Sequence, residues 1–302
     1  MKNGNLSKRL FFTLWAIPLG WWIINADFSV IPPGMLESVQ PDLTIYPGQI
    51  LAMLLIILGM SEYIRMLSIR FPQNGFWVVY IWLSFQFISS FFPELAVSER
   101  FDTFLLLMLV AGEAMLWGKA TSRWQRASLL FSGTVFLSIA GISLLYFYRE
   151  PFQTIFPRLY EHSMLSQLGI ITICGAIFLC DTAAYFVGTY FGKHHFSSIS
   201  PKKTIEGSVA GLCTSILVAS IGWFLWAGDK YPAFLGVILG ILIGVFAQAG
   251  DLLVSLMKRY YRVKDTSSII PGHGGILDRF DSVFFTAPVV SLYFWMIDKI
   301  IN

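Results

Sequence analysis

The chain has 302 residues, of which 56% are hydrophobic and 13% are charged, and its net charge is +3. Soluble domains carry about 25% charged residues, so this composition excludes a soluble globular enzyme and predicts an integral membrane protein. The three cysteines lie within apolar segments and lack metal-ligand spacing, which argues against a disulfide framework and a structural zinc site.

Nine apolar segments have about the 17–20 residues that a helix needs to cross the hydrocarbon core of a bilayer. They cover residues 10–26, 48–68, 76–92, 101–118, 127–147, 166–191, 208–227, 233–254 and 283–300. We therefore predict an all-α integral membrane protein, a polytopic helical bundle of about nine transmembrane helices. The first segment also fits a cleaved signal peptide, which would leave eight helices.

The distribution of basic residues predicts the orientation of the bundle. With the N-terminus in the cytoplasm, 16 of the 21 Lys and Arg residues fall on the cytoplasmic side. This is the sense that the positive-inside rule requires. The N-terminus is therefore predicted to be cytoplasmic, and the C-terminus to lie on the opposite side.

Two stripes of small residues follow the seventh and eighth segments at every fourth position. They are Gly207, Gly211, Ser215 and Ala219 in the seventh segment and Gly236, Gly240 and Gly244 in the eighth. Such stripes let membrane helices approach one another closely. They fit packing within one chain, and they also fit a homodimer interface.

Two carboxylates lie within or at the end of apolar segments. Asp181 has apolar residues on both sides, and because a charge in lipid is costly it predicts a site or a cavity. Asp251 lies about 27 Å along its helix, at headgroup depth on the cytoplasmic side. Its helical face continues through Ser255 to Lys258 and Arg259. These groups suit a metal–phosphate site, although such a cluster also occurs where a helix simply reaches water.

The loop after the sixth segment carries Ser200-Pro201-Lys202-Lys203-Thr204, directly before the next helix. Ammonium groups, hydroxyls and the N–H groups of a helix N-terminus together bind phosphate. The alternative is a basic loop that only fixes the topology.

The loop after the eighth segment carries Pro271-Gly272-His273-Gly274-Gly275, whose backbone amides can form a small anion nest. Asp278 and Asp281 follow with i, i+3 spacing, on one face of the last helix. With Asp251 they offer oxygen ligands for a hard cation such as Mg²⁺. Metal ions and bases in one site are typical of phosphoryl or nucleotidyl transfer.

Twelve residues of this region together resemble the signature of the phosphatidate cytidylyltransferases. They are Ser255, Lys258, Arg259, Lys264, Asp265, His273, Gly274, Gly275, Ile276, Asp278, Arg279 and Asp281. The segments 188–193 (Gly-x-x-Phe-Gly-Lys) and 200–207 (Ser-Pro-Lys-Lys-Thr-x-Glu-Gly) resemble further motifs of that family. The resemblance covers about residues 170–285, and the N-terminal half matches only in being polytopic.

The resemblance implies an enzyme that transfers CMP from CTP to phosphatidate and releases pyrophosphate, forming CDP-diacylglycerol. It implies Mg²⁺, with or without a second cation, on Asp251 and Asp278 with Asp281 in support. Residues 1–165 would be N-terminal transmembrane helices, and residues 166–302 the catalytic region with cytoplasmic loops 192–207 and 255–282. We expect a bacterial inner-membrane protein whose site faces the cytoplasm, with CTP and phosphatidate as partners and no nucleic acid.

The expected site residues fall into two groups. The expected catalytic residues are Asp251, Asp278, Lys258, Arg259, Lys264 and His273. The expected substrate-binding residues are Ser200, Lys202, Lys203, Thr204, Ser255, Gly274, Gly275, Arg279 and Asp181.

Three other functions remain open from the residues. A polyprenol or phytol kinase would also be polytopic, but it would move only the γ-phosphate of a nucleotide. An enzyme for an archaeal ether-lipid phosphate would share the chemistry and differ in the lipid tails. A transporter of an anionic solute would place its charges near mid-membrane between repeated halves, whereas here the charges gather on one face.

Overall fold

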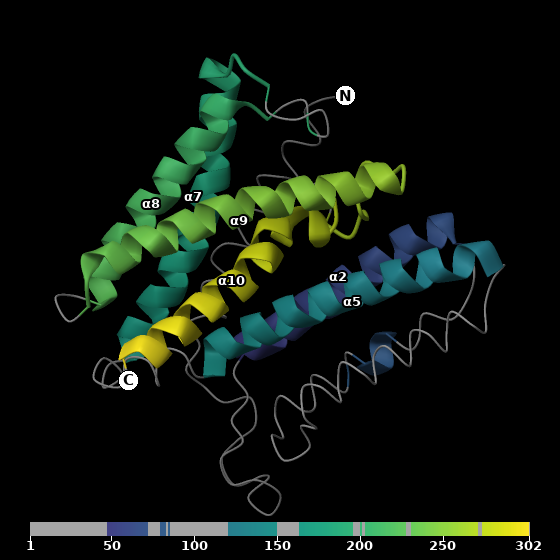
Figure 1. The fold of residues 1–302 in the computed structure, drawn as a ribbon, viewed down its shortest axis with the longest axis horizontal. Helices are drawn as coiled ribbons and strands as arrows, with labels where there is room; N and C mark the ends of the chain where they lie inside the picture. Colours follow the sequence, from purple (N-terminus) through teal and green to yellow (C-terminus); the bar gives the residue numbers. More distant parts are fainter. Residues whose placement is uncertain are drawn as a thin grey trace, which may run out of the picture. The chain divides into compact units, whose positions relative to one another are not determined.

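The structure is a computed structural model that describes residues 47–71, 79–82, 84, 120–149, 163–195, 200, 203–227, 231–270 and 274–301. Within these ranges the chain is helical, with two isolated β-bridges and no strand. The helices are α2 (Pro47–Arg70), α5 (Ala120–Arg149), α7 (Ser163–Phe191), α8 (Ile205–Ala227), α9 (Ala233–Tyr260) and α10 (Leu277–Ile301) (Figure 1). The prediction of an all-α protein is confirmed for this part of the chain.

Five of the described helices are long and apolar enough to cross a membrane, namely α2, α7, α8, α9 and α10. They correspond to the predicted segments 48–68, 166–191, 208–227, 233–254 and 283–300. Segment 127–147 is helical and lies within α5, which runs from Ala120 to Arg149.

The remaining predicted segments fall largely on residues that the structure does not describe. Segments 10–26 and 101–118 lie outside the described residues, and segment 76–92 is described only at residues 79–82 and 84. The count of nine helices and the cytoplasmic N-terminus therefore stay predictions.

The described residues belong to two compact units. One contains α2, most of α5 and the loop formed by residues 261–277. The other contains α7, α8, α9 and the part of α10 from Asp278 onward. The predicted division of the chain at residue 165 stays a prediction.

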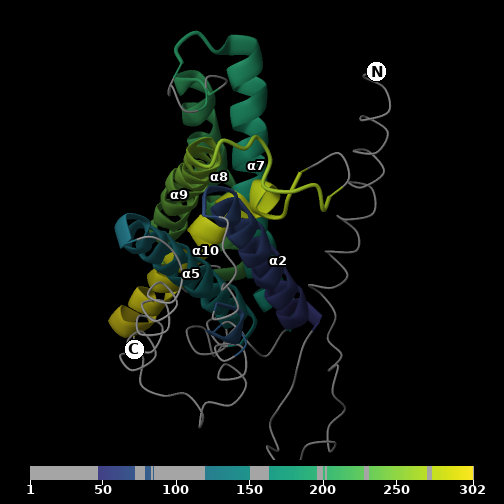
Figure 2. The same cartoon turned by 90° about the vertical axis from the view of Figure 1, so that its right-hand side faces the viewer.

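In the first unit, α2 and α5 lie side by side (Figure 1), an arrangement also visible in the rotated view (Figure 2). Small residues of α5 make this approach close, because a methyl group on Gly133 would overlap the ring of Tyr63, and one on Gly141 would press against Ile56. The Tyr63 hydroxyl donates a hydrogen bond of 2.6 Å to the carbonyl of Leu129. This bond satisfies a buried polar group at the helix contact.

In the second unit, α8 packs against both α7 and α9, and the two predicted stripes of small residues lie buried at these contacts. A methyl group on Gly207 would meet the carbonyl oxygen of Ala184 on α7, and one on Gly240 would meet the backbone of Ile216. The Ser215 hydroxyl donates a hydrogen bond of 2.9 Å to the carbonyl of Gly240. Packing within the chain therefore accounts for both stripes.

The last helix, α10, packs on α9 in the same way. A methyl group on Gly250 of α9 would press on the Asp281 carbonyl oxygen and the Phe285 side chain. Further along, the Tyr293 hydroxyl donates a hydrogen bond of 2.7 Å to the carbonyl of Leu235. The charged start of α10 is thus held against the second half of α9.

Candidate active site

The second unit gathers four carboxylates from three helices. Asp181 lies on α7, Asp251 on α9, and Asp278 and Asp281 in the first two turns of α10. Up to about a hundred positions separate them in the sequence. The packing of these helices brings them near one another: Asp251 acts electrostatically on both Asp181 and Asp281, and Lys258 acts on Asp281 and pairs with Asp278.

Asp251 pairs with the loop between α7 and α8. The Lys203 ammonium lies 2.7 Å from its Oδ2 atom, and the Ser255 hydroxyl donates to its Oδ1 atom at 3.4 Å. One turn earlier on α9, Gln248 donates from its Nε2 atom to the carbonyl of Ser208 at 3.0 Å. The loop after segment six and the face of α9 are therefore in direct contact.

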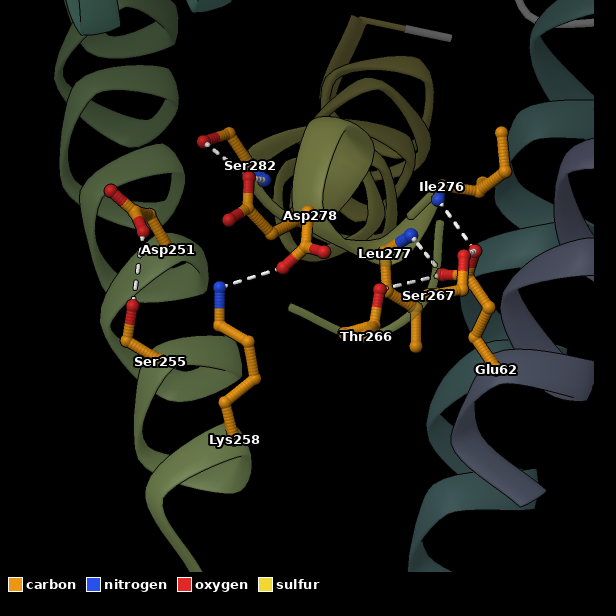
Figure 3. A network of polar contacts seen from close by, with 11 residues as sticks. Glu62, Asp251, Ser255, Lys258, Thr266, Ser267, Ile276, Leu277, Asp278 and Ser282 are labelled. Carbon is orange, nitrogen blue, oxygen red and sulfur yellow. Dashed lines mark hydrogen bonds and ion pairs between the residues drawn. The ribbon is translucent and has the colours of Figure 1, made fainter. Parts of the chain in front are cut away.

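Asp278 pairs with Lys258 in the same unit. The Lys258 ammonium lies 2.7 Å from the Asp278 Oδ1 atom, and the two side chains are only 16% and 7% exposed. Figure 3 shows Lys258 extending from α9 toward the start of α10 (Figure 3). Each charge also has the sign that its own helix end favours, because the acid lies at an N-terminus and the base at a C-terminus.

Asp181 and Asp281 meet through Ser282, a residue that the sequence analysis did not select. The Ser282 hydroxyl donates to the Asp181 Oδ2 atom at 3.0 Å, and its backbone N–H donates to the Asp281 Oδ1 atom at 2.7 Å. Asp281 is 7% exposed. In the part of the chain that the structure describes, neither aspartate forms an ion pair. The second unit therefore gathers four carboxyl groups and two lysines, and within this group Asp251 acts electrostatically on Asp281.

This donor set suits a hard cation in its chemistry. Every side chain that could act as a ligand here offers carboxylate or hydroxyl oxygen, the donor type that Mg²⁺ prefers. Two of the carboxylates, on Asp251 and Asp278, already hold a positive group at 2.7 Å in the form of a lysine ammonium. As they stand, the described residues contain no cluster of three acidic, His or Cys side chains arranged to hold a metal ion.

In the first unit, the loop before α10 is held by Glu62 of α2, which the sequence analysis missed. Four groups donate to its carboxylate: the Ser267 hydroxyl at 2.5 Å, and the Thr266 hydroxyl and the N–H groups of Ile276 and Leu277 at 2.8 Å each. Glu62 is 1% exposed, and Figure 3 shows these donors surrounding it (Figure 3). A usable signal existed, since Glu62 is an acid inside the apolar segment 48–68, as Asp181 is in segment 166–191.

The structure of this loop explains why the signature has glycine at positions 274 and 275. Gly275 lies so close to Glu62 that a methyl group on it would overlap both the Glu62 carboxylate and the Thr266 hydroxyl. Gly274 has a φ of 87°, a conformation that side chains with a Cβ rarely adopt. Its carbonyl accepts a hydrogen bond of 2.9 Å from the N–H of Ile270. A side chain at either glycine would therefore disturb the loop.

The other predicted site residues differ in exposure and in whether the structure describes them. The side chains of Arg259, Lys264 and Arg279 are exposed. Thr204, 5% exposed, caps the start of α8, where its hydroxyl accepts from the N–H of Gly207 at 3.2 Å. Ser200 is half-buried. His273 and Lys202 lie outside the described residues, and the roles of all these residues in binding stay predictions.

Comparisons with known proteins agree with the signature and extend it. The sequence model of the cytidylyltransferase family matches residues 43–297. A phosphatidate cytidylyltransferase of Synechocystis sp. is 33% identical over 293 residues, covering 94% of this chain and 92% of its own. One of Staphylococcus haemolyticus is 31% identical over 244 residues, covering 80% and 87%. One of Bacillus subtilis is 43% identical over 134 residues, covering 43% and 49%.

These matches correct the extent given to the resemblance in the sequence analysis. It was placed at about residues 170–285, whereas the family match begins at residue 43 and so includes α2. The motifs in the C-terminal half are dense in charge and glycine and are therefore visible by eye. The similarity in the N-terminal half lies in apolar helices, where few single residues stand out.

Proposed function

This chain belongs to the cytidylyltransferase family, and on that premise we propose that it transfers CMP from CTP to phosphatidate, giving CDP-diacylglycerol and pyrophosphate. It is a nucleotidyltransferase of phospholipid biosynthesis. The observation that carries the proposal is the charge network of the second unit. There, Lys203 lies 2.7 Å from Asp251, and Lys258 lies 2.7 Å from Asp278.

The reaction balances without a strong base. An oxygen of the lipid phosphate attacks the α-phosphorus of CTP, a new P–O bond forms, and the bond to the β-phosphate breaks, so that pyrophosphate leaves. The nucleophile is already an anion. The difficulty is to bring two polyanions together, which calls for positive charge and fixed geometry.

Lys203 and Lys258 are suited to this task because each is anchored by a carboxylate of the chain. A lysine held in this way is positioned before substrate arrives, which lowers the cost of ordering it. Both side chains are less than a quarter exposed, at 22% and 16%, and charges screened from water act more strongly on a phosphate. Arg259, Lys264 and Arg279, which are exposed, would neutralise the outer phosphates.

Mg²⁺, with or without a second cation, belongs to the proposal. Asp251 and Asp278 would hold it and Asp281 would support them, since all three offer the oxygen donors that it prefers. When bound, the ion would place positive charge on the reacting phosphates. Asp251 and Asp278 each hold a lysine ammonium at 2.7 Å, so both carboxylates already face a positive group.

The proposal also includes the setting of the enzyme. We propose a bundle of about nine transmembrane helices with a cytoplasmic N-terminus, in the inner membrane of a bacterium, with the site facing the cytoplasm. CTP would arrive from water, while the acyl chains of phosphatidate stay in the bilayer. A homodimer is compatible with this arrangement, although the small-residue stripes are already used within the chain.

Labelled CTP tests the proposed reaction directly. Purified full-length protein, Mg²⁺ and phosphatidate are expected to convert CTP labelled at the α-phosphorus into labelled lipid, with one pyrophosphate released for each. A lipid kinase would instead label the lipid only from γ-labelled CTP. Label from the γ-position alone, or no lipid product with phosphatidate, would overturn the proposal.

Removal of divalent cations is expected to lower the rate by about 100-fold or more, because the charge on the phosphates would lose its largest counter-charge. The measurement compares initial rates before and after dialysis against EDTA, and after Mg²⁺ or Mn²⁺ is restored. Gel filtration before and after dialysis shows whether the protein stays monodisperse. Undiminished turnover in EDTA would contradict the metal assignment.

A further inference from the structure

We propose that Glu62 is a positioning residue for the transfer reaction: its carboxylate fixes the loop that carries Gly274 and Gly275 as far as Leu277, where α10 begins. The inference rests on the proposed function, because the catalytic role of this loop comes from that proposal. It goes beyond the signature, because Glu62 lies on α2, some two hundred residues from the motif that it holds.

Glu62 does more than pack. It is 1% exposed and lies within α2, a helix apolar enough to cross a membrane. A buried carboxylate is costly, and an apolar side chain of similar volume would pack at least as well. Four hydrogen bonds compensate the charge, and all four come from the loop and the beginning of α10. The contacts of Glu62 therefore determine where this loop lies.

The two backbone contacts bear directly on α10. The first N–H groups of a helix have no acceptor within the helix, and here the N–H groups of Ile276 and Leu277 donate to Glu62 at 2.8 Å each. A carboxylate at this end of a helix is also favoured by the helix dipole. Asp278 follows Leu277 directly in the same helix. Fixing these N–H groups therefore fixes where the loop ends and α10 begins.

The two hydroxyl contacts hold the other end of the same loop. Thr266 and Ser267 donate to Glu62 at 2.8 and 2.5 Å. The same carboxylate therefore binds both the beginning of the loop and its end at α10. Gly275 allows this closure, because any side chain there would overlap the carboxylate. Both ends of the loop and the glycine of the signature therefore depend on the same acid.

Because Glu62 is buried, it can affect the reaction only by positioning other groups and not by contacting the substrate. With 1% exposure and all four donors coming from the chain itself, the carboxylate is engaged and shielded from substrate. If a substitution of Glu62 lowers the activity, the effect is therefore transmitted through the loop. A purely structural residue would reduce the yield of folded protein and leave the rate per folded molecule unchanged.

The test compares Glu62→Gln with Gly275→Ala in purified full-length protein. Glutamine keeps the size of the side chain but offers one acceptor oxygen, so at least one backbone N–H loses its acceptor. Alanine at position 275 pushes the loop off the carboxylate without changing any charge. For both variants we expect kcat per folded molecule to fall about 30-fold or more, since displacements of this kind cost up to about 100-fold. The KM for phosphatidate is expected to change less than about threefold.

Two matched variants serve as controls. Tyr63→Phe, next to Glu62, removes the hydrogen bond to Leu129 without touching the loop's acceptor. Gly175→Ala adds a methyl group to α7 where the nearest atom is 3.9 Å away. Both are expected to keep the wild-type rate per folded molecule.

Hydrogen–deuterium exchange gives a second readout that does not depend on activity. In Glu62→Gln, the amides of Ile276 and Leu277 are expected to exchange faster, while peptides from α7, α8 and α9 keep their protection. Unchanged exchange at these amides, or a wild-type rate per folded molecule in both variants, would overturn the inference. A wild-type protein that fails to label phosphatidate from CTP would instead refute the proposed function, so the two failures are distinguishable.

Discussion

Replacing Asp278 by asparagine is expected to lower the rate of CMP transfer by about 1,000-fold, the range seen when a charge-stabilising group of an active site is removed, while the protein stays folded. Asparagine has nearly the same shape, and its carbonyl oxygen can still accept a hydrogen bond from Lys258, which lies 2.7 Å from Asp278. The variant therefore removes one negative charge and keeps the contact between the two side chains, and its loss of stability is that of a Lys258 ammonium without a counter-charge. If Asp278 holds a cation, that cation loses a ligand.

The measurement is the initial rate of CDP-lipid and pyrophosphate formation per mole of monodisperse protein. Thr286→Val is a suitable control on the same helix, because it removes a buried hydroxyl that donates only to the Ser282 carbonyl at 2.6 Å. It is expected to stay within about threefold of the wild type, as is usual for a substitution away from the reacting groups. A near-normal rate for Asp278→Asn would remove Asp278 from the proposed site and, with it, the metal role.

The helices of this chain could be predicted well from sequence because their signal is strong and local. Each apolar segment from 166 onward is matched by a described helix of spanning character. The charged ends were less obvious: α9 continues beyond the apolar segment to Tyr260, and α10 begins at Leu277, six residues before its apolar segment. Hydrophobicity marks the part of a helix that lies in lipid, whereas the functional groups lie just beyond it.

The members of the charge network could be predicted, but their pairing could not. Lys203 and Lys258 were both expected to meet phosphates, and nothing in the sequence shows that one pairs with Asp251 and the other with Asp278. The pairing depends on how closely α8 and α10 pack against α9. Glycines and small residues set that depth through contacts between helices, which no local pattern specifies.

Glu62 was missed for a different reason. The same argument that selected Asp181, an acid inside an apolar segment, applies to it. Its partners, however, lie more than two hundred positions away, and the N-terminal half contains no dense motif that would draw attention to it. The bond network around Glu62 becomes visible only once the loop before α10 is placed.

The ion pair between Lys258 and Asp278 gives the second prediction of large effect. Lys258→Met is expected to lower the rate by about 1,000-fold, because an anchored charge that would face the phosphates is lost. It is also expected to destabilise the protein by about 3 kcal/mol, since removing one partner of a buried ion pair leaves the other charge buried without a counter-charge. Lys258 and Asp278 are only 16% and 7% exposed, so little water can compensate.

The double variant Lys258→Met/Asp278→Asn separates these two effects. With both charges gone, neither burial cost remains, so most of the lost stability is expected to return, as when whole buried ion pairs are replaced. The rate, however, is expected to stay at the level of the single variants, because catalysis needs the charges themselves. Thermal unfolding in detergent and the initial rate of CDP-lipid formation measure the two quantities on the same samples.

Arg259→Met provides the matched control for stability, because Arg259 is the neighbouring base and its side chain is exposed. Its unfolding free energy is expected to change by less than about 0.5 kcal/mol. If the double variant recovers activity along with stability, the pair serves only the fold, and the phosphates must be neutralised elsewhere. If it recovers neither, the loss in the single variants comes from packing at the end of α9 and not from charge. Recovery of stability alone would assign both charges to the reaction.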